Sequence, residues 1–159
     1  MKRIVGLLAI FILMGAPISM GGGVTDPLGE SENRLLVQKI VQKFVRAWND
    51  DNARAVSMLF TPNGALISPS GATANNRAGI RDLLTHEHQE IFLGTTLKKI
   101  IRTIQFPTIR VAHVNGNFTL SGVRVFLGIK TSVEGTFSFV MEKQGDSWLI
   151  NQAHIRRTS

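Results

Sequence analysis

The fold is decided by residues 37–48, which read VQKIVQKFVRAW. Apolar side chains recur three and four positions apart, and lysine, glutamine and arginine fill most of the positions between them. This spacing places the apolar side chains on one face of an α-helix and the polar ones on the other. The sequence therefore predicts a long helix that begins near Ser31 and packs against another layer. Its predicted buried stripe consists of Val37, Ile40, Val41, Phe44, Val45 and Trp48.

Residues 49–52 (NDDN) interrupt this helix. Asp51 is predicted to cap a second, shorter helix, because a carboxylate accepts hydrogen bonds from the free N–H groups of a first turn. Residues 61–64 (TPNG) then stop the helix and turn the chain into a brief strand at residues 65–68. The predicted buried side of the short helix consists of Val56, Leu59 and Phe60.

A third helix is predicted at residues 77–92, where Ile80, Leu83, Leu84 and Ile91 recur at helical spacing. Beyond Gly94 the chain becomes rich in β-formers. Proline, Asn-Gly and Gly-rich turns divide it into four long segments that we expect to pair as antiparallel strands. These segments are residues 97–106, 109–120, 133–143 and 148–156.

Several short motifs carry a family resemblance: FVRAWNDD at 44–51, MLFTPNG at 58–64, NRAGI at 76–80, FLG at 92–94 and GDSWLI at 145–150. In this order they resemble the nuclear transport factor 2-like superfamily, in particular its SnoaL-like, SgcJ/EcaC-type branch. The resemblance implies an α+β cone-shaped barrel, with three N-terminal helices packed on a strongly bent, mostly antiparallel sheet. It also implies an apolar pocket at the open end and, usually, a homodimer through the outer sheet face.

The family hosts isomerases, dehydratases, polyketide cyclases and plain binding modules, so the resemblance does not imply one function. The chain departs from the family's usual pattern at Asn63 and Asn76. It also contains no tyrosine. In ketosteroid isomerase a tyrosine and a protonated aspartate form the oxyanion hole, and that arrangement therefore has no counterpart here.

The N-terminus is typical of a secretion signal. Lys2 and Arg3 precede an apolar run, and small residues follow it. The run is shorter than the roughly 18 residues of a membrane-spanning helix, so we expect no stable membrane anchor once the signal is cleaved. We predict a signal at residues 1–22, a flexible lead-in at 23–30, one domain at 31–159, and export to the periplasm or the medium.

Composition excludes several classes of site. The chain has no cysteine, which removes disulfides and thiolate chemistry. Its net charge is +7, but the basic residues are scattered and no nucleic-acid-binding motif accompanies them, so no nucleic-acid partner is expected. His86 and His88 lack the spacing of a helical zinc site, and no phosphate-binding glycine loop occurs, so we predict neither a metal nor a cofactor.

Glu87 falls within the apolar stripe of the third predicted helix, three positions after Leu84. A carboxylate there is costly unless it reaches a cavity, a cation or water, and burial would suit it to carry a proton. The alternative is that the helix ends early and leaves Glu87 solvated. Asp51 has two interpretations as well, a helix cap or a catalytic carboxylate.

The last strand is predicted to place Trp148, Ile150, Gln152 and His154 on one side. If that side is concave, His154 could serve as a base; otherwise it is a histidine satisfied within the sheet. Arg102 shares its strand side with Ile104 and could pair with Glu87. The residues predicted to line the pocket are Trp48, Phe60, His88, Arg102 and Gln152.

Three functions remain open at this point. The first is noncatalytic binding of a small apolar or amphipathic molecule, which needs only a cavity with few polar groups. The second is a proton-transfer enzyme of the cyclase, dehydratase or isomerase type, with Glu87 or His154 as the base. The third is a protein-interaction module that uses the outer sheet face. The sequence favours the first and does not establish that the protein is an enzyme.

Overall fold

The computed structural model describes residues 27–158. The predicted signal at 1–22 and the first part of the predicted lead-in lie outside the described residues. Helix α1 spans Pro27–Asn49, so it begins before Ser31, and the second part of the lead-in is helical. Proline suits the first turn of a helix because its missing N–H is not needed there. Glu30 and Arg34 then form an ion pair one turn apart, at 2.9 Å.

The elements after α1 follow the predicted order with one addition, the short strand β2, which was not predicted. The two further helices are α2 (Ala53–Met58) and α3 (Asn76–Gln89). The strands are β1 (Phe60–Ile67), β2 (Thr73–Asn75), β3 (Thr96–Thr108), β4 (Val111–Arg124), β5 (Lys130–Gln144) and β6 (Ser147–Arg157), with a 3₁₀ turn at Phe126–Gly128 between β4 and β5. No helix among the described residues is long and apolar enough to cross a membrane.

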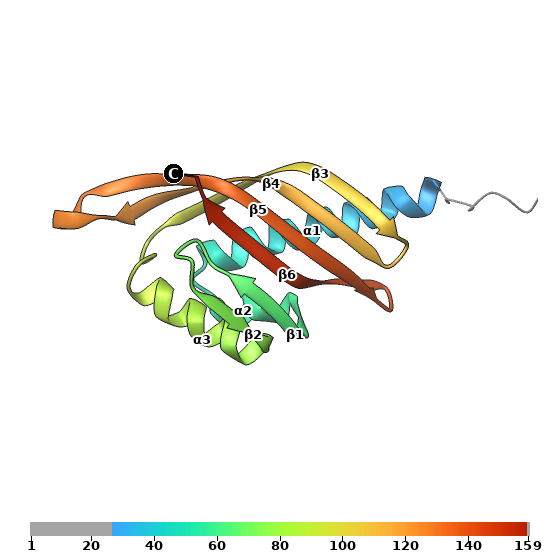
Figure 1. Ribbon diagram of the computed structural model, residues 1–159, viewed down its shortest axis with the longest axis horizontal. Helices are drawn as coiled ribbons and strands as arrows, with labels where there is room; N and C mark the ends of the chain where they lie inside the picture. The colour runs from blue at the N-terminus through green and yellow to red at the C-terminus, as the bar shows by residue number, and fades with distance from the viewer. Residues whose placement is uncertain (1–26, 159) are drawn as a thin grey trace, which may run out of the picture.

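The six strands form one sheet in the order β2-β1-β6-β5-β4-β3. Strands β3 to β6 are consecutive and antiparallel, as predicted, whereas β1 runs parallel to β6. The sheet is therefore mixed but mostly antiparallel. Figure 1 shows β3 to β6 as a bent layer, with β1 and β2 continuing the sheet below β6 and with α2 and α3 beside them. This is the predicted α+β cone.

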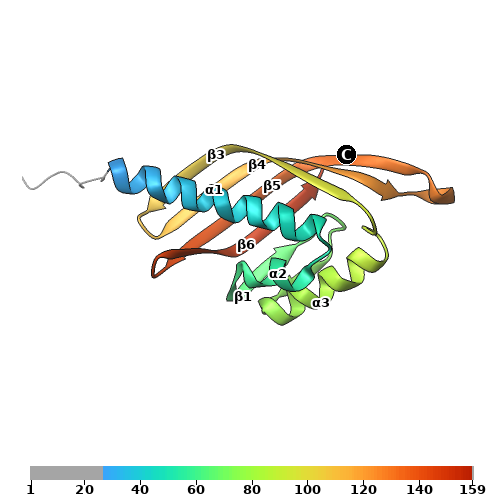
Figure 2. The same ribbon diagram turned by 180° about the vertical axis from the view of Figure 1, so that it is seen from behind.

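Helix α1 crosses the concave face of the sheet (Figure 2). Val37 and Phe44 of the predicted stripe are fully buried, and Trp48 is 1% exposed. Phe44 packs against Phe139 of β5, with ring centroids 5.3 Å apart. The predicted stripe thus packs into the centre of the core, with Ile40 and Val45 partly buried at its margin.

The bend of the sheet depends on two glycines that pair with phenylalanines across neighbouring strands. Gly116 pairs with Phe137, and Phe118 pairs with Gly135. A Cβ at Gly116 would lie 2.1 Å from the Ile100 carbonyl oxygen, and one at Gly135 would lie 2.1 Å from the Arg156 carbonyl oxygen. Each ring covers the position that its glycine leaves empty, so β4 and β5 curve inward here.

The connection between α1 and α2 corrects one prediction. Asp51 adopts a left-handed backbone (φ 51°) and ends α1, while the Asn52 N–H donates to the Ala47 carbonyl. The residue that caps α2 is Asn52, whose side-chain oxygen accepts from the Ala55 N–H at 2.9 Å. Asp51 cannot cap α2, because it is already the terminating residue of the preceding helix.

Candidate functional site

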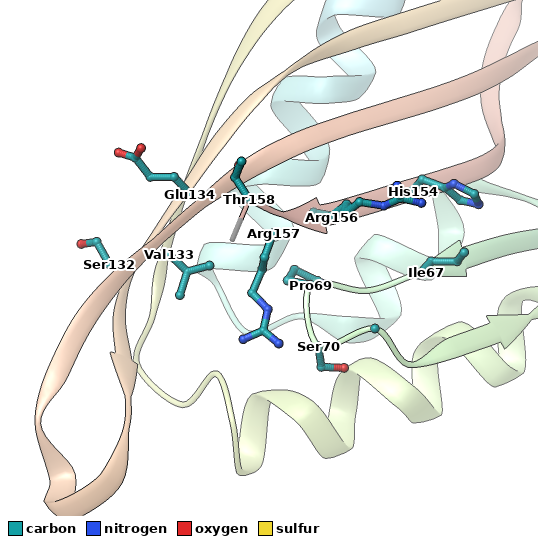
Figure 3. A pocket seen from close by; sticks show the side chains of 12 residues that line it. Ile67, Pro69, Ser70, Ser132, Val133, Glu134, His154, Arg156, Arg157 and Thr158 are labelled. Carbon is teal, nitrogen blue, oxygen red and sulfur yellow. The ribbon is translucent and has the colours of Figure 1, made fainter.

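A pocket of about 600 Å³ opens where the turn between β1 and β2 faces the ends of β5 and β6. We call it the mouth pocket; Figure 3 shows it from close by. Ser70 lines it from the turn, Val133 from β5, and Ile155 and Arg157 from β6. Its size lies within the usual range for small-molecule sites. It combines apolar wall with a few hydrogen-bonding groups.

The turn beside the pocket is held by its own hydrogen bonds. The Ser68 N–H donates to the Ala72 carbonyl and the Gly71 N–H to the Ser68 carbonyl, both at 2.9 Å. The Ser70 hydroxyl accepts from the Ala72 N–H at 3.1 Å. Gly71 has φ +91°, which a side chain would make costly. The turn therefore presents two serine hydroxyls at fixed positions.

Both hydroxyls point at Glu87 of α3. Ser68 donates to Glu87 Oε1 at 2.6 Å, and Ser70 makes a short contact with the same oxygen. Glu87 is 1% exposed, and its second oxygen, Oε2, is buried without a hydrogen-bond partner among residues 27–158. Of the two interpretations of Glu87, a buried carboxyl and a solvated one, the structure therefore shows the buried carboxyl. The carboxyl lies behind Ser70, which connects it to the mouth pocket.

The charge at the mouth is mainly positive. Arg156, Arg157 and His154 line the pocket together with one acidic residue, Glu134. In Figure 3 the Arg157 side chain extends toward Ser70 and α3, whereas Glu134 points away from the pocket. Within residues 27–158, Arg157 belongs to none of the ion pairs found. A guanidinium group without an intramolecular partner favours an anionic group on a ligand.

His154 lies at the rim of the mouth pocket, but on the outer face of the sheet. The alternation predicted for β6 holds at Trp148 and Ile150 and is wrong beyond them. A bulge opposite Val140 and Met141 shifts the register, so that Gln152 and His154 are exposed while Ala153 and Ile155 are buried. One extra residue in a strand reverses the facing of every residue after it.

The facing of Arg102 also differs from the prediction because of a shift in strand register. The register of β3 shifts between Ile101 and Thr103, and Arg102 is exposed although Ile104 is buried. Its Nε donates to the Asn117 side-chain oxygen at 3.0 Å instead of pairing with Glu87. The prediction that Arg102 shares a side with Ile104 is therefore wrong.

The other predicted site residues lie in the core or on its margin. Trp48 and Phe60 are buried in it and line neither the mouth pocket nor the hollows described below. His88 is buried against Trp48, with ring centroids 4.7 Å apart, at the base of a separate shallow hollow beside Asp51. The structure thus does not bring the predicted pocket-lining set together.

His88 has an unusual environment for a histidine. Neither ring nitrogen has a hydrogen-bond partner among the described residues, and Nδ1 lies 3.8 Å from Asp51 Oδ1. Burial lowers the pKa of His88 below its usual 6.5, and the Asp51 carboxylate partly opposes this by raising it. The desolvation of the imidazolium dominates, so the ring is neutral at neutral pH. No group of three potential metal ligands lies together in the described part of the chain.

Three residues of interest were missed by the sequence reasoning: Ser70, Arg157 and Lys99. Ser68-Pro69-Ser70-Gly71 is a turn sequence, but only the fold shows that its hydroxyls meet α3. Arg157 is the last residue of β6, and the sequence does not indicate on which side of the strand it lies. Lys99 had a usable signal, because it alternates with Leu97 and Ile101 on one side of a strand.

The fold is that of nuclear transport factor 2-like proteins. The solved structures similar to this chain include LinA, with a TM-score of 0.75, 14% identity, and coverage of 83% of this chain and 90% of that one. A second is a putative scytalone dehydratase from Novosphingobium aromaticivorans, with a TM-score of 0.72, 14% identity, and coverage of 82% and 87%. A third is an NTF-2 like protein of unknown function from Shewanella oneidensis, with a TM-score of 0.62, 20% identity, and coverage of 78% and 98%.

The sequence matches no protein-family model and no curated protein. At identities this low the structural likeness establishes the fold alone. The structures that share it include a putative dehydratase and a protein of unknown function. The function of this chain therefore has to be argued from its own site.

Proposed function

We propose that this protein binds a small amphipathic molecule that carries an anionic group, and that the mouth pocket is the binding site. The observation that carries the proposal is the position of Arg157, which extends into a pocket walled by Val133 and Ile155. An apolar wall contributes affinity by removing ligand surface from water, and a guanidinium orients a carboxylate or phosphate through paired hydrogen bonds. Ser70 lines the opposite wall, with its hydroxyl held by Glu87 and Ala72.

The proposal includes the finer family assignment and the cellular location. We place the chain in the SgcJ/EcaC-type branch on the motifs at residues 44–51 and 145–150. We also propose that residues 1–22 are removed on export, since a positive start, an apolar run and small residues occur there in that order. N-terminal sequencing of protein from the periplasm or the medium of its own host tests this, and an intact Met1 would contradict it.

The binding experiment is native mass spectrometry of protein purified from its own host, with identification of any retained small molecule. Decanoate is a defined probe when none is retained, because it joins an apolar chain to one carboxylate. Arg157→Gln should weaken decanoate binding by about tenfold, the loss expected for one charge-assisted hydrogen bond. Arg110→Gln, which changes an exposed arginine in the turn between β3 and β4, should leave it unchanged. Equal affinity of both variants and the unchanged protein would refute the site.

A second function, proton transfer, is supported by the geometry around Glu87. Ser68 donates to Glu87 Oε1 at 2.6 Å and Ser70 contacts the same oxygen, while Oε2 is buried with no hydrogen-bond partner among the described residues. A buried carboxylate with one oxygen free is suited to accept a proton, and Ser70 connects this carboxylate to the mouth pocket. The reaction that it fits is removal of a hydrogen next to a ligand carbonyl.

Deuterium exchange separates binding from proton transfer. A keto acid such as 2-oxodecanoate is incubated with the protein in D₂O, and uptake of deuterium at its third carbon is followed by NMR. Under the proton-transfer function the protein should accelerate uptake, and Glu87→Gln should abolish the acceleration while retaining binding. Binding without acceleration would reject this second function and leave the first intact.

A further inference from the structure

The side chain of Lys99 enters the hydrophobic core from β3. Lys99 lies between Leu97 and Ile101 on the inner side of the strand. Its stem is half-buried, but its Nζ is fully buried and has no hydrogen-bond partner among the described residues. None of the ion pairs found within residues 27–158 includes it. A lysine amine usually reaches water or a carboxylate, so this placement needs an explanation.

Four phenylalanine rings surround the amine. The distances from Nζ to the ring centroids are 4.2 Å for Phe137, 4.7 Å for Phe139, 4.8 Å for Phe44 and 5.9 Å for Phe118. These rings come from α1, β4 and β5, so the amine lies where the helix crosses the sheet. Burial lowers the pKa of Lys99 well below its usual 10.5. The rings attract a cation and offset part of this effect, but they replace none of the lost water.

A groove of about 820 Å³ connects Lys99 to the surface between α1 and the edge strand β3. Val41 and Val45 line it from α1, and Ile101 and Phe118 line it from the sheet. Within the described part of the chain, the charged residues that line the groove beside Lys99 are also basic: Arg46 and Lys98. Reaction in the groove requires a rotamer change that moves the amine away from the rings, and the lysine stem has four rotatable bonds for such a change.

We propose that Lys99 is a covalent capture site for apolar aldehydes and ketones that enter by this groove. A neutral amine is a nucleophile, and a lysine desolvated among apolar side chains is a known source of one. The nitrogen lone pair forms a bond to the carbonyl carbon while the carbonyl π electrons move to oxygen. Two protons pass from nitrogen to that oxygen through solvent, the C–O bond breaks, and water leaves. The product is an imine, and no oxidant or reductant is consumed.

The surroundings define the class of carbonyl compound. An aromatic or alkyl group would lie along Val41, Val45 and Phe118, where it is removed from water. A positively charged aldehyde would lose its hydration and would be repelled by Arg46 and Lys98. Once formed, a protonated imine would be attracted by the same rings that surround the amine. The groove is separate from the mouth pocket, so this inference does not depend on the proposed function.

Reductive labelling tests the inference on the whole folded protein. The protein is incubated at pH 7 with a low concentration of benzaldehyde and sodium cyanoborohydride, which reduces an imine to a stable secondary amine. Peptide mass spectrometry then gives the labelling rate of each lysine. Lys99 should be labelled at least about tenfold faster than its exposed neighbour Lys98, because its neutral fraction is larger. With betaine aldehyde, which carries a positive charge, this preference should disappear.

Two variants keep the test decisive. Lys99→Met should remove the fast labelling and leave the slow labelling of the other lysines. Val45→Trp narrows the groove without altering the amine and should slow the labelling of Lys99 but not of Lys98, with the near-ultraviolet circular dichroism confirming that the variant is folded. Arg110→Gln, in the turn between β3 and β4, should have no effect. The inference is overturned if Lys99 in the folded protein is labelled no faster than Lys98, or if Val45→Trp leaves the Lys99 rate unchanged.

Discussion

Glu87 and Lys99 are both buried, yet the residues around them stabilise them in different ways. Glu87 has two serine hydroxyls within hydrogen-bond distance of one oxygen. Lys99 has aromatic rings and, among the described residues, no hydrogen-bond acceptor. A buried carboxylate with donors keeps much of the stabilisation it had in water, whereas a buried ammonium without acceptors loses it. Replacing Lys99 is therefore expected to stabilise the protein, and replacing the serines to destabilise it.

Lys99→Met should raise the free energy of unfolding at pH 7 and make it less dependent on pH. The folded-state pKa of Lys99 lies below the unfolded value, so between the two the unfolded chain binds the extra proton. Stability therefore rises with pH through this window in the unchanged protein, and the rise is absent without Lys99. Urea unfolding from pH 7 to pH 10 measures it, with Lys98→Met as the control. A less stable Lys99→Met protein at every pH would show that the rings stabilise the charged amine.

His88 should make the protein less stable in mild acid. Its folded-state pKa is lowered below 6.5 by burial, so as the pH falls below that value the unfolded chain takes up the proton first. The contribution of neutral His88 to stability is therefore fully present above pH 6.5 and declines as the pH falls toward the folded-state pKa. His88→Phe should remove this part of the decline. Asp51→Asn should extend the decline to lower pH, because Asp51 raises the pKa of His88. Thermal melts between pH 4 and pH 8 measure both effects. If His88 is not responsible, His88→Phe will leave the dependence of melting temperature on pH unchanged.

At the scale of the elements, the paired glycines and phenylalanines of β4 and β5 allow the sheet to bend. Gly135→Ala should destabilise the protein by about 1–3 kcal/mol or more, the usual cost of inserting a methyl group into a packed site. The Cβ would meet the Arg156 carbonyl oxygen and the edge of the Phe118 ring, and backbone cannot yield as a side chain does. Urea unfolding measures the loss. Gly79→Ala, in α3, is the comparison, because a Cβ there would make only ordinary contacts, the nearest at 3.7 Å from the Asn76 side-chain oxygen.

The elements themselves were largely predictable from the sequence. The stripe from Val37 to Trp48 indicated α1 because burial on one helix face imposes a fixed spacing. Turn sequences such as Gln144-Gly145-Asp146 marked the ends of strands, since few residues tolerate the backbone they require. Phe60 was placed on a helix and instead begins β1, although it is fully buried as predicted.

The facing of residues on the long strands was less predictable. A bulge leaves no reliable mark in one sequence, yet it reverses the side on which Arg102 and His154 lie. Glu87 was identified because a charge inside an apolar helical stripe is conspicuous. Its partners, Ser68 and Ser70, could not be, because their contact with α3 depends on how the turn between β1 and β2 folds back.

At the scale of the whole molecule, we propose that two copies pair through the outer face of the sheet. This face carries a shallow hollow of about 470 Å³, lined by small polar side chains that include Asn115, Thr136 and Ser138. Analytical ultracentrifugation of the mature protein should give twice the protomer mass. Ser138→Arg should shift the equilibrium toward the monomer, since Arg102 and Arg156 already line this hollow. Thr108→Arg, at the end of β3, should leave this equilibrium unchanged. A monomer of the unchanged protein at micromolar concentration would contradict the proposal.

The two edge strands of the sheet, β2 and β3, have a consequence for storage and expression. Unpaired backbone groups on a lateral strand are a template on which further chains can add and grow into fibrils. Here β2 is only 3 residues long, and β3 has a register shift beside Arg102 and a proline at position 107. Strand β2 offers an incoming chain few backbone groups because it is short. Strand β3 offers a ladder that is interrupted by the register shift and by the proline, with a charged side chain beside it. Concentrated solutions of the folded protein should therefore stay clear, without fibres that bind thioflavin T.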